Sequence, residues 1–309
     1  MKKAIFCAAA LILGAMGFAQ NTSTGTQTGS GNNAVINQSG NNNSKVDQEF
    51  TDNKAFVDQV HKNKSTISQH GDNSPSSGNS NYAKVDQHGW DQVSWMEQGG
   101  DDNRGIVEQD GDRNNSWLQQ GNNAKAEDNK ANIKQDGDDN RSRVLQRHDN
   151  NIADIDQEGN DNSVNLEQFS KPNQTRGNYS KIDQYGNDNK AVSYQETADP
   201  AHGSSISNRE YVDQDDNNNY SNLSQIGDDN LSRVTQSGNK HNVWAGYSNY
   251  AKVMQTGDEN RSFITQEDGP GSLANSADNT ARVSQTGFGN TSTLYQYGAN
   301  SANVTQTNP

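Results

Sequence analysis

A repeated unit of about 22 residues constrains the fold of this chain more than any other feature of its sequence. In residues 279–296, NTARVSQTGFGNTSTLYQ, the side chains of Asn279, Ala281, Val283 and Gln285 stand two apart, and the same order recurs in the second half. A period of two is typical of a β-strand, whose side chains alternate between two faces. The glycine between the halves suits a tight turn with positive φ. The unit therefore predicts strand, turn, strand.

The half-unit Asn-x-small-x-apolar-x-Gln, called an arc below, recurs along nearly the whole chain after residue 20. Its closing glutamines fall at positions 27, 38, 48, 59, 69, 87, 98, 109, 120, 135, 146, 157, 168, 184, 195, 214, 225, 236, 255, 266, 285, 296 and 306. A further arc can be placed at Asn239–Ala245, where Val243 holds the apolar position and the glutamine is replaced, which brings the count to 24. Internal repetition at a fixed period indicates a stacked repeat architecture.

Two kinds of connection alternate between these arcs. Even-numbered arcs are followed by a Gln-x-Gly turn, with the glycine at positions 40, 89, 111, 137, 159, 186, 238, 257 and 287 and with exceptions after Gln59 and Gln214. The long insertions, at 72–80, 121–128, 169–177, 196–207 and 267–278, all follow odd-numbered arcs. Two distinct edges predict an all-β fold, a β-solenoid with two strands per turn, about 22 residues per turn, and cross-β stacking at ~4.8 Å per layer.

The alternation places Asn, the small residue, the apolar residue and Gln inside this solenoid. One apolar side chain per arc contributes too little burial to offset the cost of ordering the chain. The stacked amides are therefore expected to form hydrogen-bonded ladders along the axis. The predicted ladder residues are Asn103, Gln109, Asn114, Gln120, Asn140, Gln146, Asn162, Gln168, Asn189, Gln195, Asn230, Gln236, Asn260, Gln266, Asn279, Gln285, Asn290 and Gln296, and the predicted turn glycines are Gly40, Gly89, Gly111, Gly137, Gly159, Gly186, Gly257 and Gly287.

Four residues depart from the inward pattern. Ser193 and Gly25 stand where an apolar residue is expected, and Glu210 and Val164 stand where a small one is expected. The layers that contain them are predicted to be weaker.

The N-terminus reads as an export signal. Residues 1–19 combine two lysines, a short apolar run and a small-residue end, which is typical of a secretory signal peptide and too short for a membrane span. Removing them takes away Cys7, the one cysteine, and lowers the formal charge from −14 to −16. Disulfides therefore cannot stabilise the mature chain. The negative charge argues against nucleic acid and anionic membranes as partners.

At Gln285-Thr286-Gly287, followed by Asn290, Ser292 and Gln296, the sequence resembles the curlin repeat, and the same order recurs in residues 83–98, 105–120, 180–195 and 251–266. The resemblance implies a curlin-like solenoid over residues 33–309, with about 11 repeats and a terminal half arc. It also implies a secreted, extracellular amyloid fibre subunit that serves biofilm matrix, adhesion and surface colonisation. The implied partners are further copies of itself, a nucleator subunit and a curli-type outer-membrane secretion pore.

Within this family the uncharged end of the chain, residues 300–309, resembles the bulk subunit more than the minor nucleator, whose last repeat tends to be basic. Residues 20–32 form a short N-terminal segment that is the only candidate for the family's export signal. The first and last arcs match the template and carry no cap, which predicts head-to-tail docking between molecules.

Two other classes of protein remain as alternatives. A non-polymerising solenoid adhesin, including a calcium-dependent one, is compatible with the Asp-rich turns, although the Gly-Gly-x-Gly-x-Asp calcium repeat is absent. An enzyme is disfavoured, because no cluster departs from the repeat and the histidines at 61, 70, 88, 148, 202 and 241 lack metal-ligand spacing. No catalytic, cofactor-binding or metal-binding residue is predicted.

Overall fold

The computed structural model describes residues 20–71, 78–121, 126–172, 177–197, 208–239, 248–267 and 279–309. The predicted signal peptide, residues 1–19, lies outside these ranges. The regular elements of the described residues are all strands: β1 (Thr22–Ser30), β2 (Asn33–Gly40), β3 (Asn43–Thr51), β4 (Lys54–His70), β5 (Tyr82–Gly99), β6 (Arg104–Asp112), β7 (Asn115–Gln120), β8 (Lys130–Asp136), β9 (Arg141–Arg147), β10 (Ile152–Glu158), β11 (Ser163–Phe169), β12 (Tyr179–Tyr185), β13 (Lys190–Glu196), β14 (Arg209–Asn217), β15 (Asn219–Ile226), β16 (Leu231–Asn239), β17 (Asn249–Thr256), β18 (Arg261–Glu267), β19 (Asn279–Thr286), β20 (Thr291–Tyr297) and β21 (Ser301–Thr307).

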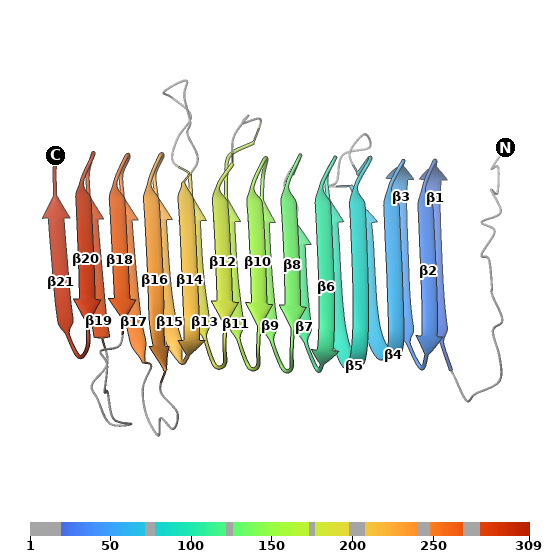
Figure 1. The fold of residues 1–309 in the computed structure, drawn as a ribbon. Coiled ribbons are helices and arrows are strands. Elements are labelled where there is room, and N and C mark those ends of the chain that lie inside the picture. The colour runs from blue at the N-terminus through green and yellow to red at the C-terminus, as the bar shows by residue number, and fades with distance from the viewer. Residues whose placement is uncertain are drawn as a thin grey trace.

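The strands form two parallel stacks that run side by side along the molecule (Figure 1). The odd sheet contains β1 and β3, the second halves of β4 and β5, and then β7, β9, β11, β13, β15, β17, β19 and β21. The even sheet contains β2, the first halves of β4 and β5, and then β6, β8, β10, β12, β14, β16, β18 and β20. The predicted all-β solenoid with two strands per turn is therefore confirmed.

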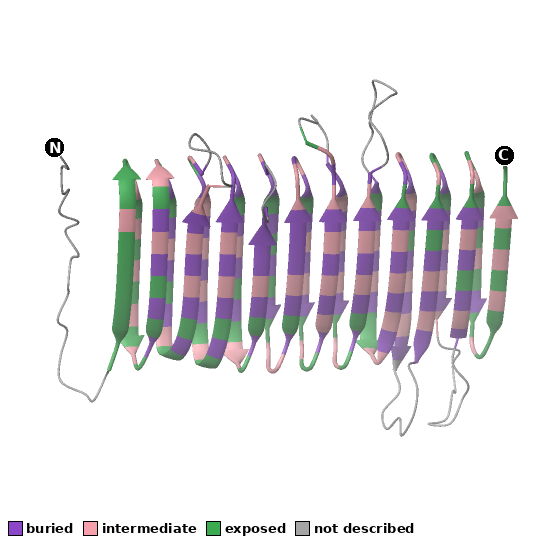
Figure 2. Ribbon diagram, turned by 180° about the vertical axis from the view of Figure 1, so that it is seen from behind, coloured by how far each residue is buried: buried purple, intermediate pink, exposed green. Residues whose placement is uncertain are grey.

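Each strand pairs in register with the equivalent residues one turn away. Gln120 stands opposite Gln146, for example, and Val212 opposite Val234. Along most strands buried and outward residues alternate, and the buried set is the small, apolar and Gln positions of the arc. The apolar cluster runs from Val46 to Val283. Figure 2 shows this alternation through the middle of the stack and the mostly exposed strands at its two ends.

Small and large side chains face one another across the thin interior. At Gly105 a Cβ atom would come within 2.7 Å of Met96 Sδ and 2.8 Å of Leu118 Cδ2, both on the facing sheet. The small residue at this position therefore lets the two sheets approach closely in most layers; Val164 and Glu210 are the exceptions.

The 24th arc predicted at Asn239–Ala245 is wrong. Most of it lies outside the described residues, but β16 pairs directly with β18 and β15 directly with β17. No layer fits between these pairs, so the solenoid contains 12 arcs in the odd sheet and 11 in the even sheet. Gly238, predicted as a turn glycine, lies within β16 opposite Asp216.

The loss of that arc also overturns the prediction of one regular edge. Up to Gly186 the glycines predicted at turns lie where the chain passes from the even sheet to the odd sheet, whereas Gly257 and Gly287 follow β17 and β19 of the odd sheet. The long connections change edge in the same way. The connection after β13 leads from the odd sheet to the even sheet, and the connection after β18 leads from the even sheet to the odd sheet. Arcs of both sheets share one template, so the sequence alone does not say which sheet an arc joins.

Candidate functional site: amide ladders, turns and end strands

Two glutamine ladders run the length of the solenoid, one inside each sheet. In every layer the Nε2 of one glutamine donates to the Oε1 of the next, with N···O distances of 2.6–3.0 Å. Of the glutamines named from the sequence, 120, 146, 168, 195 and 285 lie in the odd sheet and 109, 236, 266 and 296 in the even sheet.

Most of these glutamines also tie the two sheets together. Besides its ladder bond, Gln146 Nε2 donates to the backbone oxygen of Lys130 at 2.9 Å, across the interior. Gln266 makes the same kind of bond to Tyr250 at 3.1 Å. A buried amide with both hydrogens donated and its oxygen accepting is well satisfied, which removes the cost of burying it.

The asparagines at the start of each arc form a second pair of ladders with the opposite sense. The backbone N–H of most of these asparagines donates to the Oδ1 of the one in the preceding layer, as in Asn140 to Asn114 at 2.9 Å and Asn162 to Asn140 at 3.0 Å. Asn279 donates through its side-chain Nδ2 instead, to Asn249 Oδ1 at 2.8 Å. Asn114, Asn140, Asn162, Asn189 and Asn279 lie beside the odd sheet, and Asn103, Asn230, Asn260 and Asn290 beside the even sheet.

A further ladder at the turns was not predicted. The side-chain oxygens of Asp138, Asn160 and Asn187 accept the backbone N–H of the turn one layer before, at 2.9–3.0 Å. Asn217 extends the series at 2.8 Å. The signal in the sequence is an Asp or Asn directly after the turn glycine. These Asp and Asn side chains therefore have a defined hydrogen-bonding role in the stack.

All eight glycines named as turn residues adopt positive φ, between 97° and 130°. They also stack closely: a Cβ atom on Gly137 would lie 2.2 Å from the backbone oxygen of Gly159, and one on Gly159 would lie 2.1 Å from that of Gly186. Gly227 occupies the same position beside Gly257 and was missed, because the sequence alternation assigned it to the other kind of connection.

Two of the four exceptional residues meet inside the solenoid. The Ser193 hydroxyl donates to Glu210 Oε2, and both side chains are buried. Burial raises the pKa of Glu210 to about 8, and the hydrogen bond from Ser193 opposes that shift. The short Ser193 side chain, in place of an apolar one, leaves room for the long Glu210 side chain, in place of a small one. The interior of this layer is therefore polar.

Outward side chains mostly pair with the layer above or below. Trp95 and Trp117 stack with their ring centres 5.0 Å apart, and the Arg143 guanidinium lies 4.8 Å from the Trp117 ring centre. Lys134 Nζ lies 3.4 Å from Asp156 Oδ1 in the next layer, whereas Lys45 pairs at 2.5 Å with Asp47 of its own strand. Such contacts between outward side chains of adjacent strands support strand pairing.

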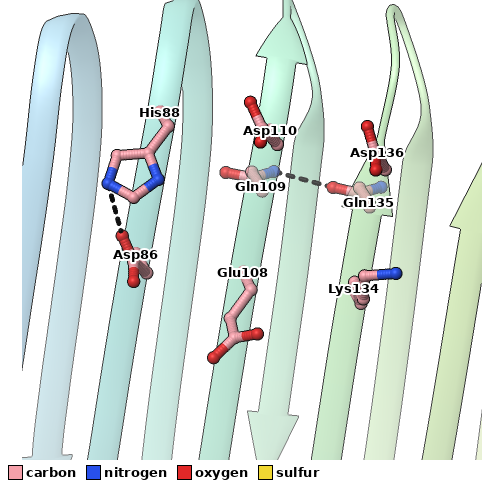
Figure 3. A pocket seen from close by; sticks show the side chains of 8 residues that line it. All are labelled: Asp86, His88, Glu108, Gln109, Asp110, Lys134, Gln135 and Asp136. Carbon is pink, nitrogen blue, oxygen red and sulfur yellow. Dashed lines mark hydrogen bonds and ion pairs between the residues drawn. The ribbon is translucent and has the colours of Figure 1, made fainter.

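A pocket on the outer side of β5, β6 and β8 is lined by charged side chains (Figure 3). Two of its four acids lie beside basic side chains: His88 Nε2 lies 3.2 Å from Asp86 Oδ1, and Lys84 Nζ lies 2.8 Å from Glu108 Oε1. Elsewhere His70 bonds Glu97 at 2.9 Å, which raises the pKa of that histidine. Within the part of the chain that the structure describes, no group of three or more metal-ligating side chains is found.

The two ends of the solenoid expose strand edges. β1 and β2 pair only toward the C-terminal side, and β20 and β21 pair only toward the N-terminal side. The ladders give these ends a direction: glutamine donors point toward the C-terminal end and glutamine acceptors toward the N-terminal end. Contact between unlike ends therefore sets donors against acceptors, and contact between like ends does not. No helix among the described residues is long and apolar enough to cross a membrane.

Comparison with known families agrees with this geometry. The family model of the curlin associated repeat matches residues 126–169 and 277–307, which span β8–β11 and β19–β21. No curated protein matches the chain. The two matched segments contain curlin associated repeats, and the layers between them share the same arc, the same register and the same pair of amide ladders.

Proposed function

We propose that this chain is the bulk structural subunit of an extracellular, curli-type amyloid fibre. The observation that carries the proposal is the pair of strand edges at the two ends of the described stack, each of which presents parallel strands and directional amide ladders. Soluble solenoids normally protect such edges. Docking of one molecule's C-terminal end on the next molecule's N-terminal end continues both sheets and both kinds of ladder. The ladder residues then hold the fibre together as they hold the monomer.

The remaining parts of the proposal rest on the family and the sequence. Residues 1–19 direct secretion, an outer-membrane pore of the curli type exports the chain, and a nucleator subunit starts the fibre at the cell surface. The role is structural rather than enzymatic. The uncharged residues 300–309 favour the bulk subunit over the nucleator. A segment used for export within residues 20–32 overlaps β1, which pairs with β3, so it becomes part of the folded stack afterwards.

A simple assembly experiment tests the proposal. Residues 20–309 are purified under denaturing conditions and diluted into buffer, and thioflavin fluorescence is followed beside fibre diffraction. Spontaneous fibres with reflections near ~4.8 Å along the axis and ~10 Å across it are expected. A folded monomer that stays soluble at high concentration, with or without calcium, would instead identify a solenoid adhesin or a nucleator.

A further inference from the structure

The first and the last described strand lie in the same sheet. β1 and β21 both belong to the odd sheet, while the even sheet runs from β2 to β20. The part of the solenoid that the structure describes therefore contains an odd number of arcs. At the C-terminal end of the stack, β21 is the last strand of the odd sheet (Figure 1). A strand that continued the winding of the chain would lie in the even sheet, stacked on β20.

This end does not fit an identical molecule placed in the same orientation. If the next β1 is stacked on β21, the next β2 stands two layers beyond β20, and one strand position in the even sheet is missing. If the next β2 is stacked on β20 instead, the next β1 and the existing β21 require the same position. A missing strand leaves a row of unpaired backbone groups beside the interior, which is costly.

Rotation of the next molecule by half a turn about the fibre axis removes the conflict. Its β1 then stacks on β20 and its β2 stacks on β21, so every strand position is filled. In register, Thr24 of the incoming molecule lies next to Thr293, and Val35 lies next to Asn303. The Nε2 atoms of Gln296 and Gln306 then point toward the Oε1 atoms of Gln27 and Gln38.

The two sheets are similar enough to accept this exchange. Both use the same arc, and β1 (TSTGTQ) and β20 (TSTLYQ) agree at four of the six positions that would stack. Within the chain itself, an arc that follows a glycine turn already stacks on an arc that precedes one. The strand that follows the Gly186 turn, β13, pairs with β15, the strand that precedes the Gly227 turn, and their six arc residues from Lys190–Tyr220 to Gln195–Gln225 stay in register.

From this parity we propose that successive molecules in the fibre are related by a rotation of about 180° around its axis, with β1 docked on β20 and β2 on β21. The proposal rests on head-to-tail assembly and adds the orientation of the partner, a second copy of this chain. The long connections of successive molecules consequently alternate between the two edges of the fibre.

Cysteine cross-linking tests the orientation in the full mature chain, residues 20–309, which contains no cysteine of its own. Three double variants are compared: Thr24→Cys with Thr293→Cys, Val35→Cys with Asn303→Cys, and Thr24→Cys with Asn303→Cys. Thr24, Thr293 and Asn303 are exposed, and Val35 is 39% exposed. The two members of each pair lie at opposite ends of one molecule, so cross-links form only between molecules. Fibres are treated with dibromobimane, which spans about one strand spacing of ~4.8 Å.

The rotated junction predicts covalent ladders on denaturing gels for the first two variants and only background for the third. A ladder for the third variant without the other two overturns the rotation. Fibres that give no ladder with any variant also overturn it, because neither end-to-end contact then exists. Failure of the cysteine-free chain to form fibres is a separate result, and it contradicts the proposed function itself.

Discussion

At the scale of single residues, the stability of this protein is expected to depend on buried amides more than on apolar side chains. Gln120 accepts from Gln98 at 2.8 Å and donates to Gln146 and to the Arg104 carbonyl at 3.0 Å each. Gln120→Leu removes these bonds and leaves buried partners unsatisfied, so a loss of about 2–4 kcal/mol is expected. The measurement is the guanidinium concentration that dissociates half of the fibres.

The adjacent residue supplies a matched control. Gln119 has the same side chain on the same strand but lies on the outer face and outside the ladder; it is 8% exposed, and its amide donates one 3.3 Å hydrogen bond to Glu97. Gln119→Leu is expected to change stability by less than about 1 kcal/mol. Equal losses of stability for the two substitutions would show that the glutamine ladder does not add to stability beyond an ordinary side-chain hydrogen bond.

The buried Glu210 gives a prediction about pH. Its pKa is about 8 in the folded state and near the ordinary value of 4.5 in the unfolded chain. Between these values the folded state holds a proton that the unfolded state has lost, so stability falls as pH rises through this window, by about 1.4 kcal/mol per pH unit. Below pH 4.5 and above pH 8 this group adds no further dependence.

Glu210→Gln keeps the size of the side chain and a hydrogen-bonding partner for Ser193 but does not titrate. Denaturation midpoints at pH 5 and pH 8 are measured for both proteins, and the difference between them isolates this one group. The wild type is expected to lose several kcal/mol more than the variant over this range. If both lose the same amount, the carboxyl is not buried in the way described.

At the scale of elements, the turns limit how closely the layers can stack. Gly159 has φ of +107°, and a Cβ atom there would lie 2.1 Å from the backbone oxygen of Gly186. That oxygen also accepts a hydrogen bond from Asn162 at 2.7 Å. Gly159→Ala therefore has to separate two turns, and a loss of more than about 2 kcal/mol is expected, with slower fibre growth followed by thioflavin fluorescence.

Gly289 is the control for this substitution. It also has positive φ, +70°, but nothing lies within 4 Å of a Cβ atom built there. Gly289→Ala is expected to cost only the backbone strain, about 1 kcal/mol. The prediction fails if the two variants behave alike, because the effect would then come from φ and not from the stacking of turns.

At the scale of the whole molecule, growth depends on the free edge of the last strand. The N–H of Thr280, the second residue of its arc, points to Asn300 of the next layer. Since successive N–H groups of a strand alternate in direction, the N–H of Asn303 in β21 points out of the C-terminal end. Asn303→Pro removes that donor and places a ring at the edge without disturbing the pairing of β21 with β19.

This variant is expected to form no fibres alone and to arrest wild-type growth when added at a small fraction, because it docks by its N-terminal end and then accepts no successor. Asn303→Ala keeps the N–H and is expected to grow normally. Seeded growth followed by thioflavin fluorescence separates the two. Normal growth of the proline variant would exclude this end as a docking surface.

The sequence by itself determined the character of each arc. The period of two, the small position beside the apolar one, and the glutamine that closes each arc are local patterns, and they predict strands, inward faces and turns because these follow from neighbouring residues. The regular spacing of the arcs also predicts stacking in register. The turn ladder of Asp138, Asn160 and Asn187 was missed, because an Asp or Asn after glycine reads equally well as an ordinary turn former.

Only the tertiary structure decided which arcs are neighbours. Because the arcs of both sheets share one template, the sequence cannot distinguish a 24th arc at 239–245 from a connection, and the pairing of β16 with β18 settles the count at an odd number. The meeting of Ser193 with Glu210 likewise depends on which strands face each other across the interior. The number of arcs, the edge at which each connection lies and the contacts across the interior all depend on how the arcs stack. Because the arcs of both sheets have the same sequence pattern, neighbouring residues do not determine them.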